Sequence, residues 1–175
     1  MKASTSISYA LLLSISLSFL HSATAALTPL LVQTCKRTSD YALCIESLSG
    51  DPRTADARYV STLADIELYN VYDKTQATLD IVGPLLQKAT DPNLVHSYGV
   101  CVGAFQEIAG DRWSGAIKAL ESGDYAGAEG QLGGIKSNVE WCLGEFGGEP
   151  QPFSEAARLV GRLADVDIGI IKLLH

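Results

Sequence analysis

The feature of this 175-residue chain that most constrains its fold is a set of four long segments whose apolar residues recur every three or four positions. That spacing is the period of one face of an α-helix. The four stripes lie within residues 63–86, 98–120, 132–146 and 156–174. Strand signals are weak, because no hairpin dipeptide sits between alternating apolar runs. We therefore expect an all-α fold, with four amphipathic helices forming an up-down four-helix bundle.

Residues suited to starting or ending a helix lie between these stripes. Residues 122–124 (Ser-Gly-Asp) predict a helix end, a turn and a new N-cap, and the Gly- and Pro-rich residues 147–152 predict a loop. Residues 83–84 (Gly-Pro) fall inside the first stripe without changing its phase, so we expect a kink there and not an end. Three helix starts share a capping side chain before a proline, namely Thr28-Pro29, Asp51-Pro52 and Asp91-Pro92.

The first 25 residues have the character of a secretory signal. Lys2 gives a positive start, residues 7–20 form an apolar run, and residues 23–25 (Ala-Thr-Ala) supply the small residues of a cleavage site. The apolar run is shorter than the roughly 20 residues needed to span a bilayer, so we expect secretion and not membrane anchoring. The predicted division of the chain is a signal peptide over 1–25, an N-terminal helical hairpin over 26–55 and a four-helix bundle over 56–175.

The mature chain is strongly acidic. Removing Lys2 from the 13 basic residues leaves 12 against 20 acidic ones, a net charge of −8. Nucleic-acid binders carry basic patches, and anionic membrane surfaces attract basic segments, so neither nucleic acid nor a membrane is an expected partner. The charge is compatible with steering toward a basic protein, and equally with a role in solubility alone.

Four cysteines lie in the mature part, which for a secreted chain predicts two disulfides. Cys101 and Cys142 are placed symmetrically about the turn at Gly123, so folding the second and third helices there brings them to the same height. Cys35 and Cys44 then pair with each other. Nine residues along one helix would separate them by about 13 Å. The chain must therefore reverse between them, which predicts an N-terminal helical hairpin clipped by its own disulfide.

Side chains suited to catalysis are sparse. The mature chain has only two histidines, His96 and His175, and no C-x-x-C pair, so neither a zinc site nor a Ser-His-Asp set is expected. His96 is interpreted as a surface residue of a helix. The sequence has no Gly-rich phosphate loop and no H-E-x-x-H motif. We expect no catalytic residue, no metal ion and no cofactor.

Two pairs of carboxylates and one group of glycines are given no functional role. Asp65 and Glu67, like Asp165 and Asp167, lie two residues apart. Residues at that spacing do not face each other on a helix, so all four are interpreted as solvated charges. The glycines of residues 130–134 lie inside a helical stripe, and we expect them to permit close helix packing.

Aromatic side chains supply the candidate anchors for a partner. Trp113 and Trp141 step with the apolar stripes, so we expect both in or near the core. Tyr125 follows the predicted N-cap Asp124 at the tip of the central hairpin. There it either anchors a partner or packs back on the loop, and the sequence leaves both open. Asp124 and Tyr125 are therefore the candidate partner-binding residues.

The mature chain resembles, over essentially its whole length, the plant family of invertase and pectin methylesterase inhibitors. The family implies the two disulfides inferred above. It also implies a stoichiometric protein inhibitor of a cell-wall or vacuolar carbohydrate-active enzyme. The resemblance lies in residues 32–35 (VQTC), 41–44 (YALC), 47–48 (SL) and 51–53 (DPR), in 89–94 (ATDPNL) with Tyr98 and Cys101, in 119–125 (ALESGDY), and in Trp141-Cys142 with Glu145-Phe146.

The resemblance implies two possible targets. One branch of the family caps the pectin-binding cleft of pectin methylesterase with its bundle helices. The other blocks acid invertase, in some members with a Pro-Lys-Phe motif at the central turn. Residues 125–127 are Tyr-Ala-Gly here, which argues against invertase. Residues 136–141 (KSNVEW) in turn lack the Thr-containing stretch of many methylesterase inhibitors.

The turn at Gly123-Asp124-Tyr125 and the region around residues 91–94 (Asp-Pro-Asn-Leu) look closer to the methylesterase branch and to pollen-allergen relatives of the family. We therefore expect an inhibitor of pectin methylesterase, secreted to the apoplast, with the vacuole as the other location. Acid invertase is the alternative partner. A ligand-carrying helical bundle is the alternative from another class, and it is disfavoured because the four stripes hold enough Leu, Val, Ile and Phe to fill the core.

Overall fold

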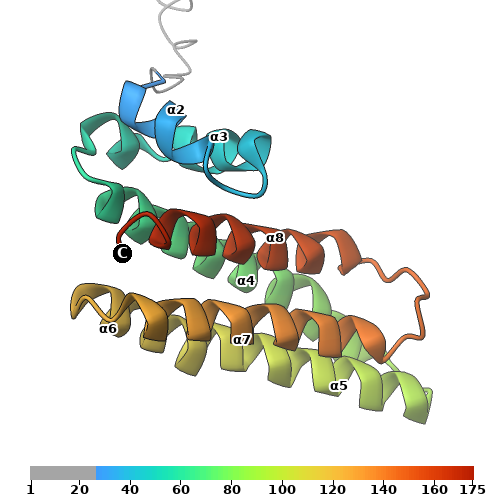
Figure 1. Cartoon of the computed structure of the whole chain (residues 1–175). Helices are drawn as coiled ribbons and strands as arrows, with labels where there is room; N and C mark the ends of the chain where they lie inside the picture. Colours follow the sequence, from blue (N-terminus) through green and yellow to red (C-terminus); the bar gives the residue numbers. More distant parts are fainter. Residues whose placement is uncertain (1–26) are drawn as a thin grey trace, which may run out of the picture.

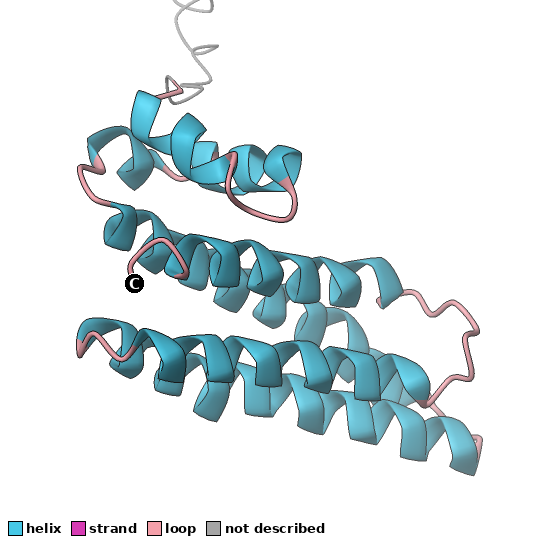
Figure 2. Cartoon of the chain, viewed as in Figure 1, coloured by secondary structure: helices cyan, strands magenta, loops and turns pink. Residues whose placement is uncertain are grey.

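The computed structural model describes residues 27–175, so the predicted signal peptide over 1–25 lies outside the described residues. Every regular element in the described range is helical, and no strand occurs there (Figure 2). This confirms the all-α prediction. Among the helices of residues 27–175, none combines the length and hydrophobicity needed to cross a bilayer.

Four helical arms run up and down around one core (Figure 1). α4 packs against α5 and α8, and α7 packs against α5, α6 and α8. The predicted four-helix bundle is therefore confirmed. The arms are α4 (Val60–Lys88), then α5 (Pro92–Glu107) with η2 (Ile108–Arg112) and α6 (Trp113–Glu121), then α7 (Tyr125–Gly144) and α8 (Ser154–Ile171).

The predicted helix boundaries are present as local hydrogen bonds. The side chains of Thr28, Asp51 and Asp91 each accept a backbone N–H of the helix that they precede, which satisfies donors that the first turn leaves free. Gly123 has a φ of 75°, a left-handed conformation that glycine adopts without strain. Pro84 lies inside α4, which continues to Lys88, so the helix does not end there.

The core is mainly apolar, and the central disulfide cross-links two of the arms that surround it. Cys101 and Cys142 are fully buried, with their Cα atoms 4.6 Å apart, as the register about Gly123 predicts. The largest fully buried side chains come from all four arms and from the hairpin: Phe105, Phe153, Leu31, Leu48, Leu63, Ile66, Leu68, Ile108, Leu132, Ile135, Leu163 and Ile170.

The second arm differs from its prediction in one respect. The stripe over 98–120 predicts one regular helix, but Ile108–Arg112 form a π-helical turn within it. Such a turn holds one extra residue. Directly after it, the Trp113 indole Nε1 donates a hydrogen bond to the Leu68 carbonyl of α4 (3.1 Å). Trp113 is thus partly buried against the core, as expected.

The N-terminal segment forms a clipped hairpin that rests on the bundle. It comprises α2 (Pro29–Cys35), α3 (Tyr41–Ser49) and the 3₁₀ turn η1 (Pro52–Asp56), and the Cys35–Cys44 disulfide joins α2 to α3. The hairpin lies along α4 and α8, on the side of the bundle opposite α5 and α7 (Figure 1). This position leaves the side formed by α5 and α7 uncovered by the hairpin.

Candidate functional site

The tip of the central hairpin is shaped by the two candidate residues from the sequence. Asp124 caps α7 by accepting the Gly127 N–H at 2.9 Å. Tyr125 is partly buried, and its ring centroid lies 5.6 Å from that of His175 at the chain end. In the free protein the Tyr125 ring thus packs against the chain end and not against the loop. A role of Asp124 and Tyr125 in partner binding stays a prediction.

The histidines do not form part of a reactive cluster. The His96 side chain is 73% exposed, and its Nε2 lies 3.6 Å from a carboxylate oxygen of Glu145. His175 contacts Glu129 at 2.8 Å. Over residues 27–175 there is no group of three or more His, Cys, Asp or Glu side chains placed to hold a metal ion.

Trp141 is on the surface, so the prediction of a core or near-core position was wrong. Its side chain is 57% exposed. The core stripe of α7 runs through Ile135, Val139 and Cys142. Trp141 is one residue, and hence about 100° of helix rotation, away from Cys142. Spacing by three or four residues counts Trp141 as part of the apolar stripe, although its side chain points outside the sector of the helix that is buried.

Trp141 lies on the side of α7 that is turned toward α5. Three residues before it, the Asn138 amide donates to the Ala104 carbonyl of α5 (3.3 Å). Four residues after it, Glu145 contacts His96 of α5. Residues three and four apart share a helix face, so the indole stands at the outer edge of the α5–α7 contact.

Glycines make up much of the outer surface next to Trp141. At six of them, an added Cβ carbon would meet no neighbouring atom within 4 Å. Each glycine in a helix interior costs roughly 0.5–1 kcal/mol relative to alanine, and packing inside the bundle does not require these six. We define the α5–α7 face as these glycines with Ser137 and Trp141: Gly99, Gly103, Gly110, Gly130, Gly133, Ser137, Trp141 and Gly144.

The prediction of close helix packing by residues 130–134 holds for only one of its glycines. A Cβ at Gly134 would lie 2.8 Å from the Arg112 guanidinium, which also pairs with Glu107 at 2.8 Å. Gly130 and Gly133 face open space. Their position on the polar side of a helix, at helical spacing, is the sequence signal that marks the α5–α7 face.

Two carboxylates interpreted as solvated are in fact buried. Glu67 of α4 and Asp167 of α8 are both 0% exposed, so that interpretation was wrong for them. Their neighbours Asp65 and Asp165 lie nearer the surface, and Asp165 pairs with Lys136 at 2.6 Å. Residues two apart do point in different directions on a helix. Which of the two is buried depends on where the hairpin and the facing helix pack against it.

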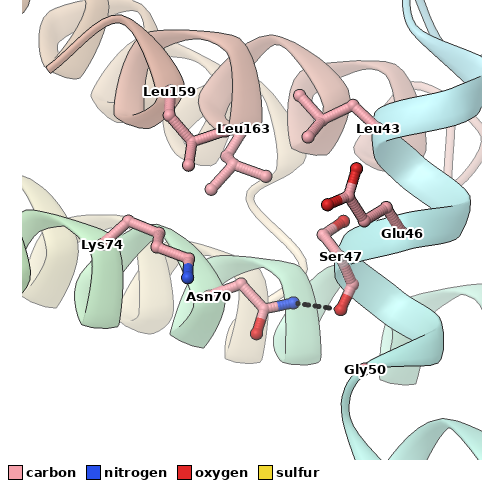
Figure 3. Close-up of a pocket in the computed structure, with 8 residues that line it drawn as sticks. All are labelled: Leu43, Glu46, Ser47, Gly50, Asn70, Lys74, Leu159 and Leu163. Carbon is pink, nitrogen blue, oxygen red and sulfur yellow. Dashed lines mark hydrogen bonds between the residues drawn. The ribbon is translucent and has the colours of Figure 1, made fainter. Parts of the chain in front are cut away.

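A small pocket marks the junction of the hairpin with the bundle (Figure 3). Its volume is about 280 Å³, below the usual range of small-molecule sites. Glu46 and Lys74 are its ionisable lining residues, and the Ser47 hydroxyl in its wall donates to the buried Glu67 carboxylate at 2.8 Å. The lining residues are Leu43, Glu46, Ser47, Gly50, Asn70, Lys74, Leu159 and Leu163.

The α5–α7 face is therefore the stronger candidate for function. It offers an uncovered helical surface with exposed backbone, bordered by one large aromatic side chain. Trp is enriched among the residues that carry binding energy at protein interfaces, and a lack of side chains lets a partner approach the helix backbone closely. Such a surface is suited to binding a macromolecule.

Comparison with known sequences gives similarity over most of the described residues. The family model described as plant invertase/pectin methylesterase inhibitor matches residues 29–166. The chain is 27% identical over 148 residues to a pectinesterase inhibitor of Actinidia deliciosa, which covers 83% of this chain and 79% of that protein. It is 28% identical over 135 residues to cell wall / vacuolar inhibitor of fructosidase 1 of Arabidopsis thaliana, covering 76% of this chain and 63% of that protein.

Two solved structures share the fold. A mutant form of a pectin methylesterase inhibitor from Arabidopsis superposes with a TM-score of 0.68 at 19% identity, covering 81% of this chain and 94% of that one. A pectin methylesterase inhibitor from Arabidopsis thaliana gives 0.62 at 18% identity, covering 83% and 95%. At these identities the likeness concerns the fold alone.

Proposed function

The chain belongs to the plant invertase/pectin methylesterase inhibitor family, and from this premise we propose that it inhibits pectin methylesterase by binding the enzyme as a stoichiometric protein ligand. The family match over residues 29–166 is the observation that carries the proposal. The similarity to a pectinesterase inhibitor supports the choice of target. Acid invertase is the second candidate, because the other relative is an inhibitor of fructosidase.

The α5–α7 face is the surface that we assign to the enzyme. The hairpin packs on the opposite side of the bundle, so this face is free for a large partner. Its glycines bring the helix backbone to the surface, and Trp141 provides an aromatic anchor at its edge. The candidate residues Asp124 and Tyr125 lie at the end of the same pair of arms, where they would contribute at the margin of the interface.

Titration of two enzymes tests the proposal. Purified residues 26–175 are added to a plant pectin methylesterase and, separately, to an acid invertase, both at about pH 5. We expect methylesterase activity to fall linearly with added protein to an end point near one inhibitor per enzyme, which is the signature of tight stoichiometric binding. Invertase activity should remain unchanged.

The outcomes separate the two targets. Inhibition of invertase alone would move the assignment to the second candidate, and no effect on either enzyme at micromolar excess would contradict the proposal. The chain alone should release no methanol from pectin, and the variant His96→Ala should inhibit as the wild type does. A turnover that disappears in His96→Ala would instead identify an enzyme.

Alanine at three glycines should change stability and binding in opposite directions. In Gly99→Ala/Gly103→Ala/Gly130→Ala, the added methyl groups meet no neighbouring atom. The free energy of unfolding should therefore rise by about 1.5–3 kcal/mol in chemical denaturation. Inhibition should weaken about tenfold or more, because the new side chains hold the enzyme away from the backbone.

Gly161→Ala is the matched control for the glycine variant. Gly161 is on α8, where a Cβ would make an ordinary contact with Val139 at 3.7 Å. This change should also stabilise the fold, but it should leave inhibition unaltered. A stabilised triple variant that inhibits as well as the wild type would show that the enzyme binds elsewhere.

We further propose that the protein enters the secretory pathway and acts in the cell wall, with the vacuole as the other location. The predicted signal over residues 1–25 and the use of all four cysteines in disulfides support this location. Expression of the full chain in plant cells should yield a secreted product whose N-terminus is Ala26. Retention of Met1 in an intracellular product would contradict it.

A further inference from the structure

The N-terminal hairpin is attached to the bundle through a buried carboxyl group. The Ser47 hydroxyl of α3 donates to Glu67 Oε2 of α4 at 2.8 Å, and the Asn70 amide donates to the same oxygen at 3.1 Å. The Asn70 amide also reaches the Ser47 carbonyl at 3.3 Å (Figure 3). Glu67 is therefore the acceptor around which the hairpin and the bundle meet.

A second carboxyl group is buried on α8. Asp167 of α8 is fully buried, and neither of its side-chain oxygens has a hydrogen-bond partner among the described residues. Glu67 Oε1 also lacks one. An ionised carboxylate only accepts hydrogen bonds, whereas a protonated one has a donor of its own. Three buried acceptor oxygens without donors are much more costly on ionised carboxylates than on neutral carboxyl groups, which favours protonation here.

Electrostatics in this region favour the neutral forms. Burial raises the pKa of Glu67 to about 7, although the hydrogen bonds from Ser47 and Asn70 act in the opposite direction. Burial also raises the pKa of Asp167 well above its ordinary value, and the nearby carboxylates of Glu67 and Asp65 raise it further. Each effect follows from the cost of holding charge away from water or beside a like charge.

The other charged groups around the pair do not neutralise it. Burial raises the pKa of Asp65. The charge of Arg53 on η1 lowers that pKa, and the charge of Glu121 on α6 raises it. Arg53 is itself paired with Asp51. No titratable side chain other than a disulfide-bonded cysteine occurs on α2. The other charges at the junction include Glu46 of α3 and Lys74 of α4, which line the pocket, and the exposed pair Asp40–Arg162 between the hairpin and α8. Lys36 and Arg37, in the turn after α2, are exposed, and the next residue, Thr38, packs on Gly169 of α8.

We propose that Glu67 and Asp167 form an acid pair that makes docking of the N-terminal hairpin depend on pH. When both carboxyls are neutral, the hairpin stays docked. When they ionise, two like charges stand in a buried space in which neither Asp167 oxygen has a partner among the described residues. Lifting the hairpin is the motion that exposes Glu67 to solvent. The hairpin is the element whose release disturbs the core of the bundle least.

The direction of the pH effect follows from the raised pKa values. In the open state Glu67 has its usual pKa near 4.5, and in the docked state about 7. Docking is thus fully favoured below about pH 4.5 and weakens as the pH rises through 7. The acidic conditions of a plant cell wall keep the hairpin closed, and neutral conditions favour opening.

Amide hydrogen exchange at several pH values tests the proposal. Exchange of α3 amides (Tyr41–Ser49) is divided by that of α7 amides (Tyr125–Gly144) in the same sample, so that the intrinsic effect of pH on exchange cancels. Between pH 5 and pH 8, this ratio should rise by roughly tenfold or more in the wild type. In Glu67→Gln/Asp167→Asn, which keeps the size of both side chains but cannot ionise, the ratio should stay constant.

Asp165→Asn is the matched control, because it removes a carboxylate nearer the surface, two residues from Asp167. Its α3/α7 exchange ratio should rise between pH 5 and pH 8 as in the wild type. A double variant whose exchange ratio rises with pH as in the wild type would overturn the proposal. Loss of protection in α3 and α7 together as the pH rises would also overturn it. If the double variant does not fold, carbon-13 titration of the wild type decides. Glu67 and Asp167 carboxyls that stay protonated above pH 6 support the acid pair, and titration of both below pH 5 overturns it.

Discussion

Replacing Trp141 with alanine should weaken inhibition of pectin methylesterase at least thirtyfold and change the free energy of unfolding by less than about 1 kcal/mol. A tryptophan that becomes buried as an anchor in an interface contributes about 2 kcal/mol or more to binding, which corresponds to about thirtyfold in affinity. The indole is 57% exposed in the free protein, so the bundle gains little from it. Inhibition titrations and denaturant unfolding of the same preparation measure the two quantities.

Tyr41→Ala provides the matched control for this experiment. Tyr41 is another exposed aromatic residue, 45% accessible, but it lies on α3 of the hairpin, away from the α5–α7 face. Its loss should leave inhibition within about twofold of the wild type. If Tyr41→Ala weakens inhibition and Trp141→Ala does not, the enzyme binds the hairpin side and the assignment of the face is wrong.

Removing the central disulfide should destabilise the whole bundle. In Cys101→Ala/Cys142→Ala, the lost cross-link closes a loop with a sequence separation of 41. The loop-entropy estimate for that length is about 4 kcal/mol, a large share of the roughly 5–15 kcal/mol typical of a domain. We expect the Tm to fall by about 10 °C. Circular dichroism should show the bundle helices melting together, because this bond joins two arms of one core.

The N-terminal disulfide offers the contrasting case. Cys35→Ala/Cys44→Ala opens a loop with a sequence separation of only 9, for which the estimate is about 3 kcal/mol. Its effect should be confined to α2 and α3, whose amides should lose protection while those of α7 keep theirs. A cooperative loss of protection in both variants would contradict the view that the hairpin is a separately opening element.

The helices and their connections could be predicted because local chemistry determines them. A capping aspartate before a proline, such as Asp91-Pro92, satisfies the first N–H groups of a helix wherever the helix lies in the fold. The pairing of Cys101 with Cys142 followed from counting residues about a turn. These features depend on near neighbours along the chain and on length alone.

Features that depend on what covers a helix were not predictable in the same way. Glu67 sits beside Leu68 and Ile66 in a broad apolar region of α4, and it is buried because α3 folds back over it. Nothing near it in sequence encodes that cover. The prediction of a core position for Trp141 was wrong for the opposite reason. Trp141 lies at the boundary of an apolar stripe, and its side chain stays 57% exposed.

The single extra residue in η2 (Ile108–Arg112) changes what the second arm can tolerate. One residue corresponds to about 100° of rotation about a helix axis, and the wider π turn absorbs that rotation. Trp113 and Ala116, which follow the turn, therefore keep their packing toward the core. Removing one residue from η2 should thus leave a regular helix with the same face of α6 turned inward, so the length of this arm can change without a change in what the bundle buries.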